Sequence, residues 1–212
     1  MRKLSRFVVT VAVIGGALVG LARATAIRWW RVPSDDPYLE ASIAPSLRGG
    51  DLIILWRLTA PHVGDLVLCP EPKQPDRIVI GRITAIDGET IDIDGNTLRI
   101  NGHRAATQGD CLEDPFTAID PQTQIPLEQR CSQEEVGPRV HMRGNTRGQA
   151  PPKVSETTPP GTVFLVSDNR QMPYDSRDFG PVERATCKET VVFRLVSAAG
   201  FTDVAHRLSI VR

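Results

Sequence analysis

The most conspicuous pattern of hydrophobic positions lies at the N-terminus. An almost uninterrupted apolar run extends over residues 7–22, and Arg23 interrupts it. Counted on to Ile27, the segment is about 20 residues long, the length that a helix needs to cross the hydrocarbon core of a bilayer. The pattern therefore predicts one N-terminal transmembrane helix, within an anchor that we place at residues 1–31.

The residues that flank this run favour an uncleaved anchor. Basic residues precede it, and Trp29 and Trp30 follow it, where aromatic rings settle at a membrane interface. A cleaved signal peptide is the alternative, because the small residues at 22, 24 and 26 resemble a cleavage site. We expect a single-pass inner (plasma) membrane protein, with a cytoplasmic N-terminus and its main domain periplasmic or extracellular.

Beyond the anchor, short runs of β-branched and aliphatic residues replace any helical periodicity. The predicted strands cover residues 51–58, 65–69, 77–86, 90–93, 97–100, 162–166 and 190–196. Asp94-Gly95-Asn96 supplies the positive-φ positions of a tight turn, so residues 90–100 should form a hairpin. The sequence predicts a mainly β fold with a coiled, barrel-like antiparallel sheet as its core.

A polar stretch interrupts this strand pattern at residues 103–158. It is rich in Pro, Gln, Gly and Thr and poor in periodicity, so we expect a loosely ordered insertion. The β core should then comprise residues 32–102 and 159–212.

The four cysteines fit an exported domain. Cys111 and Cys131 lie in the polar stretch, where a thiol has no core to fill, so we predict a disulfide that closes a loop of about 20 residues. Cys69 and Cys187 lie in apolar surroundings and are interpreted as small buried hydrophobes, with a second bridge left open.

The charge balance excludes one class of partner. The chain has 25 basic and 25 acidic side chains and no net charge. A nucleic-acid-binding protein would instead carry a basic excess on one face. We expect no nucleic acid partner, no cofactor and no metal.

Three blocks of sequence carry the candidate chemistry. They are Ser42-Ile-Ala-Pro-Ser-Leu47 followed by Gly50-Asp51, the stretch 81–91 running on to 98–102, and Pro-Pro-Gly-Thr-Val-Phe-Leu-Val-Ser-Asp-Asn-Arg at 159–170 with Asp-Ser-Arg at 175–177. In order and spacing they resemble the bacterial type I signal peptidase (signal peptidase I) family. These blocks cover most of the chain outside the insertion.

The resemblance implies a function. Members of that family are membrane serine endopeptidases that cut signal peptides from translocated preproteins. Ser42 would occupy the nucleophile position, with a neutral lysine as general base and an oxyanion hole beside it. The substrate would be held as an added strand. The implied partners are signal peptides or preproteins, together with membrane lipid around the N-terminal helix.

The chain departs from this family pattern at three positions. Gly81, immediately before Arg82, stands where the base lysine belongs; Glu40 stands where a hydroxyl or glycine serves the oxyanion hole; Pro173 replaces a serine that steadies the lysine. Losing a general base costs about 10²–10⁴ in rate. Losing an oxyanion donor costs about 10²–10³. The ordinary Ser–Lys mechanism is therefore not available.

The residues that form the scaffold near the site are retained. They are Arg82, Asp168, Asn169 and Arg177, and the resemblance implies that Asp168 and Arg177 pair to hold the loops. Two hypotheses remain: a signal-peptidase-like endopeptidase with an unconventional base, or a catalytically inactive homologue that keeps the peptide groove. A third, weaker possibility is that the insertion is the working surface.

Five side chains are weighed as substitutes for the missing base. Glu40 is interpreted as a solvated loop carboxylate. His62 and His206 are expected at the surface, whereas His103 and His141 border the insertion and could fold over the site.

Overall fold

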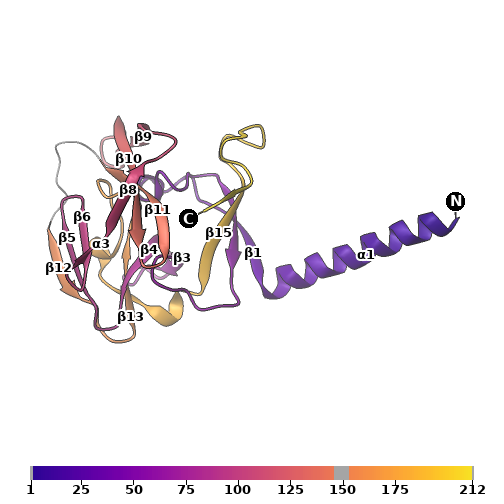
Figure 1. The fold of residues 1–212 in the computed structure, drawn as a ribbon, viewed down its shortest axis with the longest axis horizontal. Helices are drawn as coiled ribbons and strands as arrows, with labels where there is room; N and C mark the ends of the chain where they lie inside the picture. Colours follow the sequence, from indigo (N-terminus) through magenta and orange to yellow (C-terminus); the bar gives the residue numbers. More distant parts are fainter. Residues whose placement is uncertain (1, 146–152, 212) are drawn as a thin grey trace.

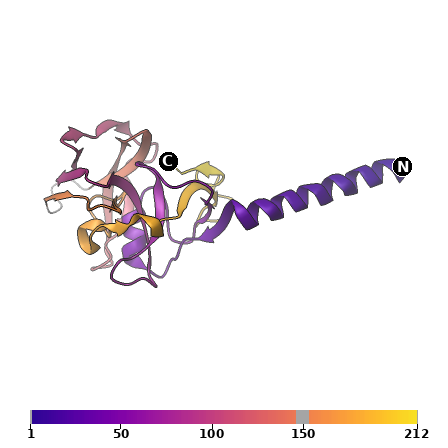
Figure 2. The ribbon, with the colours of Figure 1, turned by 90° about the horizontal axis from the view of Figure 1, so that it is seen from below.

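The computed structural model describes residues 2–145 and 153–211, without the side chains of residues 2–9, 18, 22 and 24. A long helix, α1 (Arg2–Thr25), projects from a body made almost entirely of strands, and both views show this separation (Figures 1 and 2). The prediction of a mainly β fold is confirmed.

The predicted membrane anchor finds no support in this structure. Within the described residues, no helix is both long enough and apolar enough to cross a membrane. The apolar run on which the prediction rests includes residues 7–9, 18 and 22, whose side chains are not described.

The predicted anchor extends to residue 31, beyond the end of the N-terminal helix. The helix ends at Thr25, and strand β1 (Ile27–Arg31) follows. Trp29 and Trp30 belong to β1, whose backbone pairs with β2 (Leu52–Trp56). Trp30 packs against the apolar core, and the Arg23 guanidinium lies 4.7 Å from the centre of the Trp29 ring. These tryptophans are therefore part of the sheet, since strand pairing satisfies the backbone there.

The main sheet is a curled, antiparallel half-barrel. Its strand order is β1-β2-β15-β3-β4-β13-β14, and β16 pairs with β15. Besides β1 and β2, its strands are β3 (Leu66–Pro70), β4 (Ile78–Ile86), β13 (Thr162–Val166), β14 (Val182–Glu183), β15 (Glu189–Val196) and β16 (Ser209–Ile210). Strands β2, β3, β4, β13 and β15 agree with predicted strands within a few residues, whereas β1, β14 and β16 were not predicted.

Two smaller antiparallel sheets complete the body. One has the order β12-β5-β6-β7, with β5 (Thr90–Asp94), β6 (Thr97–Ile100), β7 (His103–Arg104) and β12 (Val154–Thr157). The other has the order β11-β10-β8, with β9 added to β10; its strands are β8 (Ala106–Asp110), β9 (Phe116–Ile119), β10 (Pro126–Val136) and β11 (Arg139–Asn145).

The predicted hairpin is confirmed and the expectation of a loosely ordered insertion is wrong for its described part. Asp94 pairs with Thr97 across a turn in which Gly95 has φ +57°. Strands β7 to β11 lie within residues 103–145 and β12 covers residues 154–157, although many of their side chains are polar. Pairing of backbone N–H and C=O groups orders these strands without requiring apolar periodicity on both faces.

Both pairs of cysteines form disulfides. The predicted Cys111–Cys131 bridge is confirmed. Cys69 and Cys187, interpreted as buried thiols, form a second bridge that ties β3 to the segment before β15. Their apolar surroundings were identified correctly, but the sequence left the bridge open because residues 118 positions apart reveal no proximity.

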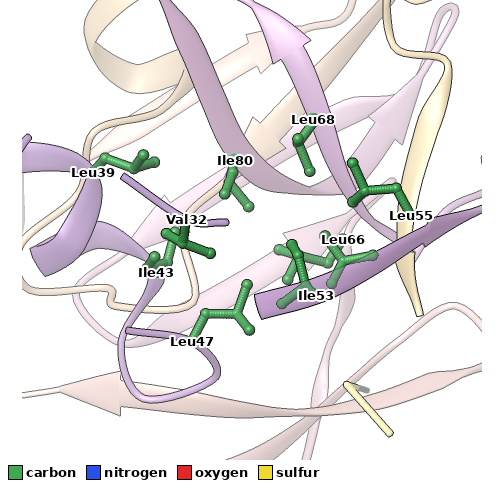
Figure 3. Packing of buried hydrophobic residues seen from close by; sticks show 10 residues of the cluster. Val32, Leu39, Ile43, Leu47, Ile53, Leu55, Leu66, Leu68 and Ile80 are labelled. Carbon is green, nitrogen blue, oxygen red and sulfur yellow. The ribbon is translucent and has the colours of Figure 1, made fainter. Parts of the chain in front are cut away.

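Three short helices also lie in the described chain after α1. They are α2 (Pro37–Ile43), α3 (Ser176–Phe179) and the 3₁₀ turn η1 (Arg184–Thr186). α2 matters most, because Leu39 and Ile43 point from it into the half-barrel and meet Ile80 of β4 (Figure 3). This apolar contact fixes α2, and with it Ser42, against the sheet.

Candidate functional site

The nucleophile position lies in a helix rather than a turn. Asp36 caps α2 by accepting hydrogen bonds from the backbone N–H groups of Tyr38 and Leu39, and Pro37 opens the first turn. The helix ends at Ile43, because the residue before Pro45 is pushed into an extended conformation. Ser42 is therefore in the last turn of α2.

The Ser42 side chain is buried and directed at the backbone. It has no exposed surface, and its hydroxyl donates to the carbonyl of Leu39 at 2.9 Å. Among the described residues this is its only hydrogen bond partner. A general base must be within hydrogen-bond reach of the hydroxyl, and a backbone carbonyl cannot take the proton.

Asn169 fixes the same turn from the other side. Its backbone N–H donates to the Ser42 carbonyl at 2.9 Å, and its side-chain amide donates to the Ala41 carbonyl at 2.9 Å. Both donors satisfy carbonyls at the C-terminal end of α2, where a helix leaves them without intrahelical partners. Asn169 thus holds the Ser42 backbone in the observed position.

Gly81 lies on β4 opposite Val67 of β3. A Cβ atom at this position would lie 3.0 Å from Cβ of Leu165 on β13, closer than ordinary van der Waals contact. The space that a longer side chain needs next to the backbone is therefore already occupied by Leu165. The position of the base therefore lacks a lysine in the sequence and lacks space for one in the structure.

The other two departures behave differently. Glu40 is half-buried on α2, where it lines an open groove and its carboxylate lies beside the backbone of Gly49. Its carboxylate forms no ion pair or hydrogen bond within the described part of the chain. Pro173 is half-buried in the loop before α3 and has no hydroxyl to donate. Neither residue supplies a base to Ser42.

A buried ion pair underlies the site. Arg82 donates to Asp168 through two nitrogens, at 2.9 and 2.7 Å, and its third donor reaches the Gly64 carbonyl. Asp168 also accepts from the Ser46 hydroxyl. Both partners of the ion pair are almost completely inaccessible to solvent. This contact ties β4 to the loop after β13 and to the segment that follows α2.

The expected Asp168–Arg177 pair is wrong. Arg177 instead donates two hydrogen bonds to the Asp175 carboxylate, of 2.9 and 2.7 Å. Burial alone would raise the pKa of Asp175, but the Arg177 guanidinium and the backbone donors hold it below the usual value. Two acidic residues and two arginines lie near one another in this region, and spacing along the chain did not reveal which of them pair.

A second buried charge cluster lies beside the first. Glu134 of β10 accepts from Arg143 at 2.9 Å and also pairs with Arg170. The His141 ring lies between the two clusters, 3.6 Å from Glu134 and 3.7 Å from Asp168. Burial, followed by the nearby arginines, lowers the pKa of His141 well below its ordinary value.

The histidines do not supply a base to Ser42. His141, one of the two histidines that could fold over the site, lies beside the scaffold ion pair. It contacts Asp168 and Glu134 instead of the Ser42 hydroxyl. His62 is exposed, as expected, and His103 of β7 is exposed as well instead of covering Ser42. His206 is half-buried, contrary to expectation, because it contacts Asp203 and Glu113.

A polar clasp also holds the N-terminal end of α2. The Asp36 carboxylate that caps the helix accepts three hydrogen bonds of 2.8–3.0 Å from Arg77, which immediately precedes β4. The Arg77 guanidinium lies 4.0 Å from the centre of the Tyr174 ring. Burial and a hydrogen bond to Glu71 raise the pKa of Tyr174 to about 12, so the phenol keeps its proton as a donor. No sequence pattern indicates this clasp, because Asp and Arg are common at protein surfaces and Asp36 and Arg77 are far apart in the chain.

Comparison with known proteins agrees with the resemblance seen in the motifs. The family model described as signal peptidase, peptidase S26, matches residues 4–196. No curated protein matches the chain.

Proposed function

Because this chain belongs to the signal peptidase S26 family, we propose that it is a catalytically inactive homologue that binds extended peptide segments of exported preproteins. One observation carries the proposal. The Ser42 hydroxyl is buried in α2 and donates to the Leu39 carbonyl, so no base is in place to activate it.

The position of the missing lysine supports the same conclusion. A serine hydroxyl is a weak nucleophile until a base takes its proton. At Gly81 the neighbouring Leu165 side chain fills the space beside the backbone. Losing general-base catalysis alone costs about 10²–10⁴ in rate. The scaffold ion pair of Arg82 and Asp168 is in place, so the loops around Ser42 keep a fixed geometry without a base.

The disulfides support a proposal for the compartment. Two bridges, Cys69–Cys187 and Cys111–Cys131, support an oxidising environment outside the cytoplasm. That is where translocated preproteins emerge, and it is the compartment in which we propose that the β body works. Signal peptides and preproteins are the proposed partners.

The test uses the full-length chain and a preprotein with a small-x-small cleavage site. Cleavage is followed on gels and binding by the change in anisotropy of a labelled preprotein, for the natural chain and for Ser42→Ala. We expect saturable binding by both proteins and cleavage by neither. Cleavage that disappears in Ser42→Ala would show an endopeptidase with an unconventional base, the competing function. Absence of preprotein binding would contradict the peptide-binding part of the proposal.

A further inference from the structure

An open groove runs between α2 and the disulfide-closed segment of the smaller sheet. Its volume is about 650 Å³, within the range of about 300–1,000 Å³ typical of ligand sites. Five residues of the α2 region form one wall: Glu40, Ala41, Ala44, Pro45 and Arg48. Residues 112–119, which include all of β9, form the other.

The groove follows the edge of β9 and not one of its faces. Phe116 and Ala118 are buried on one face of the strand, whereas Thr117 and Ile119 are exposed on the other. Residues from both faces line the same groove. Because successive side chains of a strand point to opposite faces, only the edge of the strand is adjacent to all of them.

That edge carries free backbone groups. Among the described strands, β9 pairs with β10 alone, with Ala118 opposite Leu127. The hydrogen bond from Asp120 N–H to the Ile125 carbonyl sets the alternation along the pair. The backbone groups of Ala118 therefore point toward β10, and those of Thr117 and Ile119 point into the groove. Unpaired strand edges of this kind accept an additional strand.

The groove also has a charge preference. Glu113 pairs with Arg48 and His206, and Asp114 pairs with Arg130. Glu40 is left as the acidic group of the groove that has no ion pair within the described residues. A carboxylate beside an added strand favours a cationic side chain on that strand.

We propose that this groove binds an extended peptide that adds to the free edge of β9 and places a lysine or arginine side chain at Glu40. Ala41, Ala44 and Ala118 line the groove and are almost completely buried, so they give it an apolar floor for the side chains of the peptide. The site rests on the proposed peptide-binding function, and it moves the bound segment away from Ser42 and Gly81 to the α2–β9 side.

The test measures binding of two fluorescein-labelled peptides to the full-length chain by fluorescence anisotropy. The probes are acetyl-Ala-Val-Lys-Val-Ala-Val and the same peptide with Glu in place of Lys. We expect the lysine peptide to bind more tightly. Glu40→Gln should weaken the lysine peptide about fivefold, which is typical of a partly exposed ion pair, and Glu40→Lys should reverse the preference. Glu183→Gln, at an exposed position on β14, is the charge control.

A second pair of variants tests the strand edge. Thr117→Pro removes the N–H that points into the groove, and edge positions tolerate proline. It should weaken both peptides about tenfold, whereas Thr117→Ala keeps the N–H and should bind as the natural chain does. Circular dichroism checks folding, and the Glu40 variants decide if Thr117→Pro unfolds.

Equal binding by Thr117→Pro and Thr117→Ala, or by Glu40→Gln and Glu183→Gln, overturns the groove assignment. Binding of preprotein without binding of either probe does so too, while leaving the proposed function intact. Failure to bind preprotein at all removes the proposed function itself.

Discussion

The two sides of the nucleophile segment differ in what fills them. On the apolar side, Leu39 and Ile43 of α2 pack with Ile80 of β4, whereas Gly81, the next residue of β4, faces Leu165 in a separate apolar cluster. The scaffold side is filled by charge, with Arg82, Asp168 and His141 all buried. The packing leaves no base for Ser42, whereas the ion pairs preserve the loop geometry. The difference shows that ion pairs far apart in the sequence hold the loops around Ser42, independently of any base at Gly81.

The largest expected effect comes from breaking the scaffold. Asp168→Ala removes the partner of Arg82 and the acceptor of Ser46, and leaves a buried guanidinium uncompensated. Loss of one partner of a buried ion pair costs about 3–5 kcal/mol. Urea denaturation should show this loss, with the exposed-site variant Asp94→Ala as control. A loss below about 1 kcal/mol would mean that the pair is not structural.

Gly81→Lys tests the apolar side. The new side chain must displace Leu165, and overpacking of a core costs about 1–3 kcal/mol. The lysine should also fail to restore preprotein cleavage. Combining it with Leu165→Ala should give a smaller total loss than the sum of the single losses, because the two changes offset each other. Recovery of cleavage by Gly81→Lys alone would show that the site is open.

The pH dependence of stability distinguishes the charged side. The pKa of His141 is lowered in the folded state, so the unfolded chain binds a proton that the folded chain does not. The stability should therefore be complete above the ordinary value of 6.5 and decrease as the pH falls below it, with a slope of up to about 1.4 kcal/mol per pH unit.

The matched variant is His141→Gln, which removes the titrating ring. It should flatten this part of the stability profile, measured by denaturation between pH 5 and 8. A profile that is identical in the two proteins would assign the dependence to other groups.

Ser42→Ala should have the smallest effect. It removes one buried hydrogen bond to the Leu39 carbonyl, worth about 1 kcal/mol. Alanine recovers part of this through its helix propensity. Thermal unfolding should change by only a few degrees, and preprotein binding should be unchanged. A large loss of either property would mean that the hydroxyl has a role beyond its contact with the backbone.

The strands were predictable because their signal is local. Residues 77–86 are rich in β-branched residues, which indicates a strand, and Asp94-Gly95-Asn96 is a sequence typical of a tight turn. The strands within residues 103–145 were not predictable in this way. Polar strands held by backbone pairing show no clear alternation of hydrophobic and polar residues in the sequence. The boundary between α1 and β1 was missed because Trp29 and Trp30 suit an interface and a strand equally well.

The candidate site divides along the same line. Sequence motifs located Ser42, Gly81 and Arg82 within the family pattern, but the pairing of Asp168 with Arg82 was not readable from them. The spacing of charged residues says which groups exist and says nothing about which of them meet in space.

The sequence by itself determined the family, the mainly β architecture, the absence of a lysine at Gly81 and the Cys111–Cys131 bridge. Only the tertiary structure decided that Ser42 is buried in a helix, that Leu165 fills the space beside Gly81, and that β10 is the sole partner of β9 among the described strands. The first set depends on residue identity and local pattern. The second depends on contacts between segments far apart in the chain, which packing and backbone pairing select.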